Sequence, residues 1–254
     1  MKCRYETADI FMKPLNKNNM KSKLAVFDFD YTIKQPTPGY CLGVSHLFPE
    51  KKVPEELEKN RDQGWDKFSR AVLSHVNDLE GITAEMLRDG MSNYNGNLVD
   101  GIDEVIRYLS TDHDIIIVSD SFTVNIEVYM KKCGLLDLIE GMFCKPTKIT
   151  DEGKIQFDEI PIEWGGSCPR SGRLLCKGKI LRNFIKDRKY DEIKFFGDGS
   201  NDLCPSLILE AKDRVFPRIG YPLVTLLTNG EHEVSAKIFP WNDGHDILDE
   251  LKGK

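Results

Sequence analysis

The sequence predicts an α/β fold: a Rossmann-like parallel sheet with helices on both faces and a small helical cap inserted after the first strand. Continuous apolar runs typical of buried parallel strands occur at Leu24–Phe27, Asp114–Ser119 and Glu192–Phe196. Helical patterns alternate with the later runs, as in a parallel sheet that is covered on both faces. A long segment of helical periodicity separates the first two runs and indicates an insertion.

The chain begins with a polar stretch that is rich in Asn and Lys. We expect residues 1–22 to form a flexible N-terminal extension, and the stretch has no apolar core of the kind found in secretory signals. After the first strand, Lys34–Gly39 contains two prolines and a glycine and has the composition of a loop.

The insertion is predicted to form the cap. Apolar residues recur at mostly three- and four-residue spacing from Leu57 to Val76, and Thr83 is placed to cap a further helix. We therefore expect a helical cap over residues 40–97. A cap inserted where the active site opens excludes water and shapes specificity.

Residues 23–39 and 98–254 are expected to form the core domain. Helical patterns cover Leu98–Ser110, Phe122–Cys133, Cys176–Lys186, Asn201–Leu209, Tyr221–Thr228 and His245–Leu251. Further strand patterns occur at Phe143–Pro146, Arg214–Phe216 and Ser235–Phe239, and a hairpin pattern at Lys148–Phe157.

The composition narrows the class of partner. The formal net charge is −6, which argues against nucleic acid, because phosphate backbones are bound by basic surfaces. No apolar segment is long enough to span a bilayer, so we expect no membrane partner. Nothing in the sequence indicates an obligate protein partner. The expected partner is a small molecule.

Cysteine usage bears on the compartment. The chain has seven cysteines, an odd number, and with no signal peptide pattern a disulfide framework is not expected. A reducing, cytoplasmic location follows as the expectation. The sequence contains no Cys-x-x-Cys pair, which argues against a structural zinc site.

Polar residues follow three of the predicted strands. They are Asp28, Asp30 and Thr32 after the first, Ser119 and Asp120 at the second, and Asp198 and Asp202 at the third. Ligands of open parallel sheets bind beyond the carboxyl ends of the strands, so these residues are expected to converge there. Two acids on alternate strand positions project to one face, and a divalent cation removes their mutual repulsion.

This set of residues is suited to phosphoryl transfer. Asp28 is the candidate nucleophile, which would form an aspartyl-phosphate, and Asp30 is the candidate general acid and base. Mg²⁺ is the expected cofactor, held by Asp28, the carbonyl of Asp30 and Asp198, with Asp202 behind them. Ser119 would donate a hydrogen bond to the phosphate, and a lysine would neutralise its charge.

The motifs together resemble those of the haloacid dehalogenase-like hydrolases. The resemblance spans residues 23–202 and includes Asp28-Phe-Asp30-Tyr-Thr32, the strand that ends at Ser119, and Gly197-Asp-Gly-Ser-Asn-Asp202. It implies phosphate contacts for Thr32 and a lysine at the start of the preceding helix. Lys177 and Lys179 both qualify by position, and the Cys-Lys-Gly-x-Ile-Leu pattern favours Lys177.

Within that superfamily the chain looks like the phosphoethanolamine/phosphocholine phosphatase group, which includes pyridoxal-phosphate phosphatase. The segments that carry this likeness are Val118–Ser121, Gly199–Pro205, Phe216–Pro222 and Phe239–Trp241. The likeness implies that Asp120 recognises the substrate. The sequence departs from this group at two places. Gly39 occupies the position of a second Asp that recognises the substrate in the group, and Glu163–Cys168 lacks two histidines that the group carries.

The sequence leaves several alternatives open. Small phosphomonoesters like phosphoethanolamine and phosphocholine are the expected substrates, with pyridoxal phosphate, thiamine monophosphate or phosphoserine as alternatives. A phosphotransferase, or an inactive phosphate-binding scaffold, is compatible with the same fold. Ser119 and Asp202 can also act as helix caps, and Asp120 as an ordinary loop residue.

Overall fold

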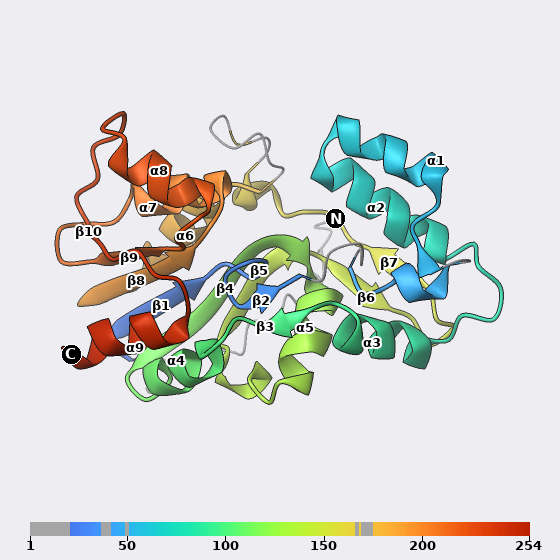
Figure 1. The fold of residues 1–254 in the computed structure, drawn as a ribbon, viewed down its shortest axis with the longest axis horizontal. Helices are drawn as coiled ribbons and strands as arrows, with labels where there is room; N and C mark the ends of the chain where they lie inside the picture. The colour runs from blue at the N-terminus through green and yellow to red at the C-terminus, as the bar shows by residue number, and fades with distance from the viewer. Residues whose placement is uncertain (1–20, 37–41, 49–50, 166–167, 169–174) are drawn as a thin grey trace, which may run out of the picture.

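The computed structural model describes residues 21–36, 42–48, 51–165, 168 and 175–254. Most of the predicted N-terminal extension and Gly39 lie outside these residues. The main sheet has six strands in the order β10-β9-β8-β1-β4-β5, and each neighbouring pair is parallel (Figure 1). The strands are β1 (Lys23–Phe27), β4 (His113–Phe122), β5 (Gly141–Lys145), β8 (Glu192–Gly197), β9 (Arg214–Pro217) and β10 (Lys237–Ile238).

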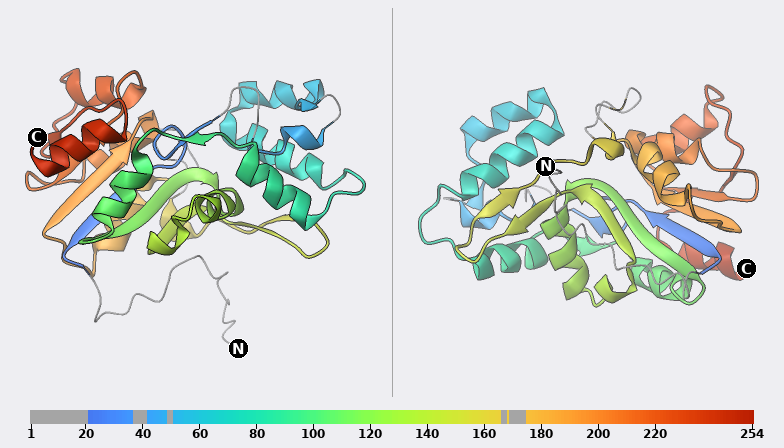
Figure 2. Two further views of the ribbon diagram at one scale, coloured as in Figure 1. Left: turned by 60° about the horizontal axis from the view of Figure 1, so that its bottom comes forward. Right: turned by 180° about the vertical axis from the view of Figure 1, so that it is seen from behind.

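Helices cover both faces of this sheet, as the two further views show (Figure 2). The core helices are α4 (Ile102–Leu109), α5 (Thr123–Lys132), α6 (Lys177–Ile185), α7 (Leu203–Ser206), α8 (Pro222–Thr228) and α9 (Gly244–Lys252). Alternate residues of β1 belong to different cores: Ala25 and Phe27 pack with α4, α5 and α9, whereas Leu24 and Val26 pack with α6 and α8. The predicted α/β fold class is confirmed.

Aromatic rings form a rigid base under the strand ends. Phe27 of β1 stacks on Phe196 of β8 with ring centroids 4.3 Å apart, and Phe196 stacks on Phe216 of β9 at 4.6 Å. Trp241 is buried in the same core and donates its indole N–H to the carbonyl of Phe216 at 2.8 Å. These contacts pack β1, β8 and β9 against one another directly before the polar residues at the strand ends.

The inserted segment contains α1 (Glu55–Glu58), α2 (Trp65–Val76) and α3 (Ala84–Asn93). The Thr83 side chain accepts from the backbone N–H of Met86, so Thr83 caps α3 as its pattern predicts. The short strands β6 (Thr147–Ile149) and β7 (Ile155–Phe157) form an antiparallel hairpin. Apolar residues of α2 and α3 share one core with Phe122 and Ile155, so the hairpin and the end of β4 form the base of the helical segment.

The loop predicted for Lys34–Gly39 is wrong at its first two residues, and residues 37–39 lie outside the described part of the chain. Lys34 and Gln35 form β2 (Lys34–Gln35), which pairs antiparallel with β3 (Asn97–Leu98). The predicted helix at Leu98 accordingly starts later, at Ile102, after Gly101 has taken a left-handed φ of 70°. This two-stranded element joins the ends of the inserted segment, and the pairing is invisible locally because each strand has two residues.

Candidate active site

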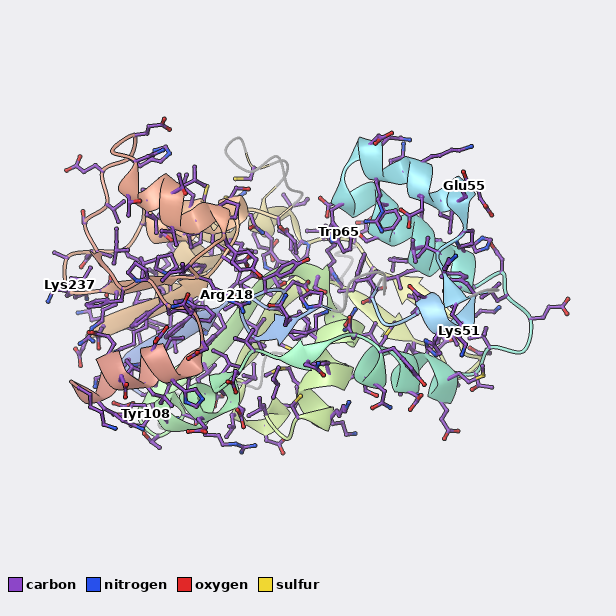
Figure 3. The ribbon with its side chains drawn as sticks, in the orientation of Figure 1. Lys51, Glu55, Trp65, Tyr108, Arg218 and Lys237 are labelled. Atoms are coloured by element: carbon purple, nitrogen blue, oxygen red, sulfur yellow. The ribbon has the colours of Figure 1, made fainter. Side chains whose placement is uncertain are left out.

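The residues after β1 form a tight turn. The N–H groups of Ile33 and Lys34 both donate to the carbonyl of Phe29 at 2.9 Å. Tyr31 has a φ of 62°, a left-handed conformation that costs a residue with a side chain about 1–3 kcal/mol. Arg218, which Figure 3 shows beside β2, donates to the carbonyl of Tyr31 at 2.5 Å and holds this turn in place.

Asp28 lies at the centre of the site. Its side chain is buried, and its Oδ1 accepts from Lys177 Nζ at 2.8 Å and from the N–H of Phe29 at 2.6 Å. Burial raises the pKa of Asp28 well above its usual value, although the charge of Lys177 opposes this shift. The contact with Lys177 therefore favours the ionised form of this carboxylate against the effect of burial.

Asp202 organises the turn that follows β8. Its Oδ2 accepts from the N–H groups of Asp198 and Gly199 at 3.0 and 2.9 Å. Its Oδ1 accepts from Lys177 Nζ at 2.7 Å, with both side chains fully buried. The protein's own donors thus occupy both oxygens of Asp202, which makes it a positioning group for Asp198 and Lys177.

The lysine between these acids is Lys177. Burial lowers its pKa, but the carboxylates of Asp202 and Asp28 outweigh this effect and raise it above the usual value. Lys179 is exposed, and its Nζ lies 3.5 Å from the carbonyl oxygen of Ile162. Of the two candidates, only Lys177 contacts the acids among the described contacts.

Three carboxylates are grouped closely enough to share a metal ion. Oxygens of Asp28, Asp198 and Asp202 all lie within 4.8 Å of one another. Thr32 Oγ1 donates to Asp198 Oδ1 at 3.4 Å. Burial and the neighbouring Asp202 raise the pKa of Asp198 to about 7. A set of hard oxygen ligands whose charges repel in a buried site fits a hard divalent cation such as Mg²⁺.

Asp30 takes a different position from Asp28. Its Oδ1 forms an ion pair with Lys34 Nζ at 2.8 Å, and the buried Lys34 also donates to Asn95 Oδ1 at 2.7 Å. The loop predicted from the sequence assigns no role to Lys34, whereas the structure places it between Asp30 and Asn95. A spacing of four residues pairs side chains on a helix, but this stretch is a turn that enters β2, so the local sequence does not indicate the contact.

Ser119 and Asp120 lie on the neighbouring strand. The β1–β4 register pairs Phe27 with Ile117, which puts Ser119 one residue beyond the level of Asp28. Ser119 Oγ accepts from the N–H of Ser121 at 3.1 Å. Asp120 Oδ2 accepts from Asn201 Nδ2 at 2.5 Å, and burial raises its pKa.

A further ion pair, which the sequence did not predict, lies near Asp120. Lys145, at the end of β5, pairs with Asp66 in the first turn of α2. The charges of both residues act on the carboxyl group of Asp120. Trp65 lies at the end of α2 that faces the core (Figure 3). This pair therefore links the inserted segment to the sheet beside the candidate recognition residue.

The fold is that of the haloacid dehalogenase-like hydrolases, and the sequence comparison places the chain in a phosphatase family. Residues 23–254 match the family model described as "Putative Phosphatase", and the chain belongs to this family. No helix among the described residues combines the length and apolar character needed to cross a membrane.

Named relatives support this assignment. Pyridoxal phosphate phosphatase PHOSPHO2 of Mus musculus is 28% identical over 241 residues, covering 90% of this chain and 97% of the relative. The phosphoethanolamine/phosphocholine phosphatase of Gallus gallus is 27% identical over 242 residues, covering 90% and 87%. The family group predicted from the motifs is therefore confirmed.

Solved structures show the same fold. A phosphoserine phosphatase, solved as an analogue of its phospho-aspartyl intermediate, aligns with a TM-score of 0.55 and 17% identity. The alignment covers 91% of this chain and 99% of that protein. At this level of identity the likeness concerns the fold.

Proposed function

We propose that this phosphatase hydrolyses small phosphomonoesters in a Mg²⁺-dependent reaction through an aspartyl-phosphate on Asp28. One observation carries the proposal: Asp28 is buried at a strand end, in contact with Lys177 and grouped with Asp198 and Asp202. A carboxylate that is held beside a fixed cation is suited to attack phosphorus.

In the first step, a carboxylate oxygen of Asp28 attacks the phosphorus in line. The bond between phosphorus and the alcohol oxygen breaks, and Asp30 gives its proton to the leaving alcohol. In the second step, Asp30 takes a proton from water as the water attacks the phosphorylated Asp28. Inorganic phosphate leaves, and the free carboxylate is restored. The contact with Lys34 fixes the position of the Asp30 side chain in the turn after β1.

The remaining groups act on charge and position. Lys177 neutralises charge on the phosphoryl oxygens, and Ser119 and Thr32 are the proposed hydrogen-bond partners of the phosphate. Asp28, Asp198 and the carbonyl of Asp30 would hold Mg²⁺, with Asp202 behind them. When bound, the ion supplies positive charge that screens the phosphate from these acids.

The proposed substrates are esters like phosphoethanolamine and phosphocholine. The carboxyl group of Asp120 is the group expected to attract their positively charged head. Pyridoxal phosphate is the second candidate, because Lys145 adds a positive charge near Asp120 and disfavours a purely cationic head group. Relatives of this chain are named after both kinds of substrate. Small phosphorylated metabolites, rather than nucleic acids, membranes or proteins, are the proposed partners.

The proposed domain division follows the sequence. Residues 23–39 and 98–254 form the core and residues 40–97 the cap, with residues 1–22 as an extension. Contacts between α2, α3 and the β6–β7 hairpin support a cap that rests on the core through the hairpin. We further propose a cytoplasmic location.

The decisive experiment compares Asp28→Asn with the wild type and with Asp187→Asn, a matched change at an exposed position. Phosphate release is measured with phosphoethanolamine, phosphocholine, pyridoxal phosphate, thiamine monophosphate and phosphoserine, with Mg²⁺ and with chelator. Turnover is expected to disappear only in Asp28→Asn and in chelator, with all proteins folded. Mass spectrometry of acid-quenched wild type should find one phosphoryl group on the peptide that contains Asp28.

Other outcomes would contradict the proposal. Turnover in Asp28→Asn at the wild-type rate would exclude Asp28 as the nucleophile. A wild-type protein that binds phosphate but releases none from any ester with Mg²⁺ present would be the inactive scaffold instead.

A further inference from the structure

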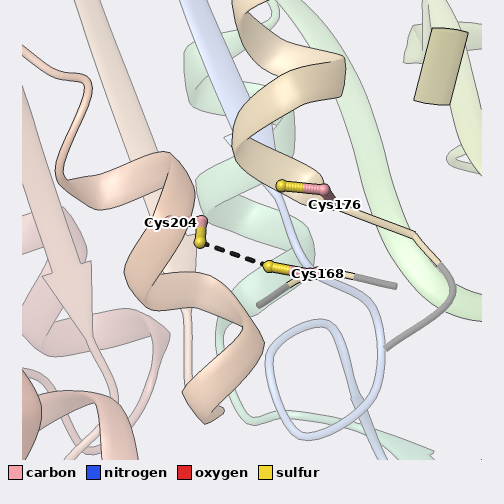
Figure 4. Close-up of side chains that lie close together, drawn as sticks. All are labelled: Cys168, Cys176 and Cys204. Carbon is pink, nitrogen blue, oxygen red and sulfur yellow. Dashed lines mark hydrogen bonds between the residues drawn. The ribbon is translucent and has the colours of Figure 1, made fainter. Parts of the chain in front are cut away.

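Three cysteines from separate segments converge beside the candidate active site. The Sγ atoms of Cys168, Cys176 and Cys204 all lie within 4.8 Å of one another. Cys168 and Cys204 are buried, and their Sγ atoms are 3.5 Å apart (Figure 4). Cys176 is half-buried and points toward the other two. None of these three residues has a role in the proposed hydrolysis.

The spacing suits metal ligands. Two thiolates that bind one Zn²⁺ at about 2.3 Å each, in tetrahedral geometry, lie roughly 3.8 Å apart. The 3.5 Å between Cys168 and Cys204 is close to that value, and far above the ~2.05 Å of a disulfide. A third thiol at the same place is superfluous for a disulfide but supplies a third ligand for a metal ion.

We propose that Cys168, Cys176 and Cys204 form a binding site for Zn²⁺, with water in the fourth position. Each thiol loses its proton to the solvent as it binds, so three sulfur–zinc bonds form and up to three protons are released. Thiolates select soft or borderline cations such as Zn²⁺, whereas the oxygen cluster around Asp198 suits Mg²⁺. The two sites therefore discriminate between the two ions.

The position of the thiols gives the ion a structural role. Cys176 directly precedes Lys177 at the start of α6, and Cys204 lies in α7, two residues after Asp202. The helices are so close that a Cβ atom on Gly178 would lie 2.8 Å from the carbonyl oxygen of Cys204. An ion bound across Cys176 and Cys204 would hold together the two segments whose Lys177–Asp202 contact orders the site.

The sequence argued against such a site. Cys176 follows Cys168 by eight residues and precedes Cys204 by 28, so the cysteines form no short paired motif. The parallel sheet brings the starts of α6 and α7 together, and only then do the thiols become neighbours.

The test uses the full chain, stripped with chelator under reducing conditions and kept in excess Mg²⁺ to occupy hard oxygen ligands. Zn²⁺ binding is measured by elemental analysis. Cd²⁺ binding is followed by its thiolate charge-transfer absorption, which carboxylates do not produce. Wild type and Cys144→Ser, a change at a buried cysteine outside the cluster, should bind one ion per chain. Cys168→Ser, Cys176→Ser and Cys204→Ser should each weaken binding at least tenfold.

Alkylation of the wild-type protein keeps the proposal testable if the serine variants do not fold. Bound Zn²⁺ should protect Cys168, Cys176 and Cys204 from alkylation, and should leave the rate at Cys133 unchanged. Equal alkylation of the cluster with and without Zn²⁺, or no thiolate absorption with Cd²⁺, would overturn the proposal. So would a protein that takes up no Zn²⁺ but forms a Cys168–Cys204 disulfide with oxidised glutathione.

Discussion

Replacing Lys177 by methionine tests the electrostatic design of the site. Lys177 Nζ lies 2.8 Å from Asp28 Oδ1 and 2.7 Å from Asp202 Oδ1, in a fully buried position. Removing one partner of a buried ion pair costs about 3–5 kcal/mol. Asp28 can take up a proton when Lys177 is removed, because burial raises its pKa, and this reduces the cost. We therefore expect the free energy of unfolding to fall by about 3 kcal/mol.

The same substitution should act strongly on catalysis. Loss of one fixed donor to a developing anion lowers kcat by about 10²–10³-fold. Lys179→Met is the matched control: Lys179 is exposed, so we expect a change in stability within about 0.5 kcal/mol and an unchanged kcat. Urea unfolding gives the stability, and hydrolysis of p-nitrophenyl phosphate in saturating Mg²⁺ gives kcat. A wild-type kcat in Lys177→Met, or a comparable loss of kcat in Lys179→Met, would contradict the role assigned to Lys177.

The pKa of Asp198 is about 7 without metal, so protons compete with Mg²⁺ for this carboxylate at lower pH. Calorimetry should show that the affinity for Mg²⁺ rises from pH 6 to pH 8 and that Mg²⁺ binding at pH 6 releases protons. An affinity that does not change with pH would contradict this prediction. In Gly178→Ala the new methyl group clashes with the backbone of Cys204. Thermal unfolding should show that the free energy of unfolding falls by about 1–3 kcal/mol. An unchanged stability would mean that α6 and α7 move apart without cost. Lys145→Met removes the cation that pairs with Asp66. The ratio of kcat/KM for phosphoethanolamine to kcat/KM for phosphoserine should therefore rise. An unchanged ratio would mean that Lys145 does not act on the substrate.

The strands of the core were predictable because their side chains are buried on both faces. A continuous apolar run such as Ile115–Val118 is compatible with few other environments, and the acid that follows each run is then placed by the parallel register alone. The start of α4 was not predicted correctly, because Leu98 belongs to β3 and the helix begins only at Ile102. Local periodicity does not distinguish the last residue of a strand from the first of a helix.

The α/β class, the phosphatase family and the set of strand-end acids were predictable from the sequence, because they depend on burial patterns and on residues close together in the chain. Which side chains contact one another depends on the tertiary packing. Lys177 is distinguished from Lys179 by the burial of one face of α6, and Lys145 at the end of β5 pairs with Asp66 in the first turn of α2. Contacts of this kind depend on how helices and strands pack over long distances in sequence, where no local pattern records the partner.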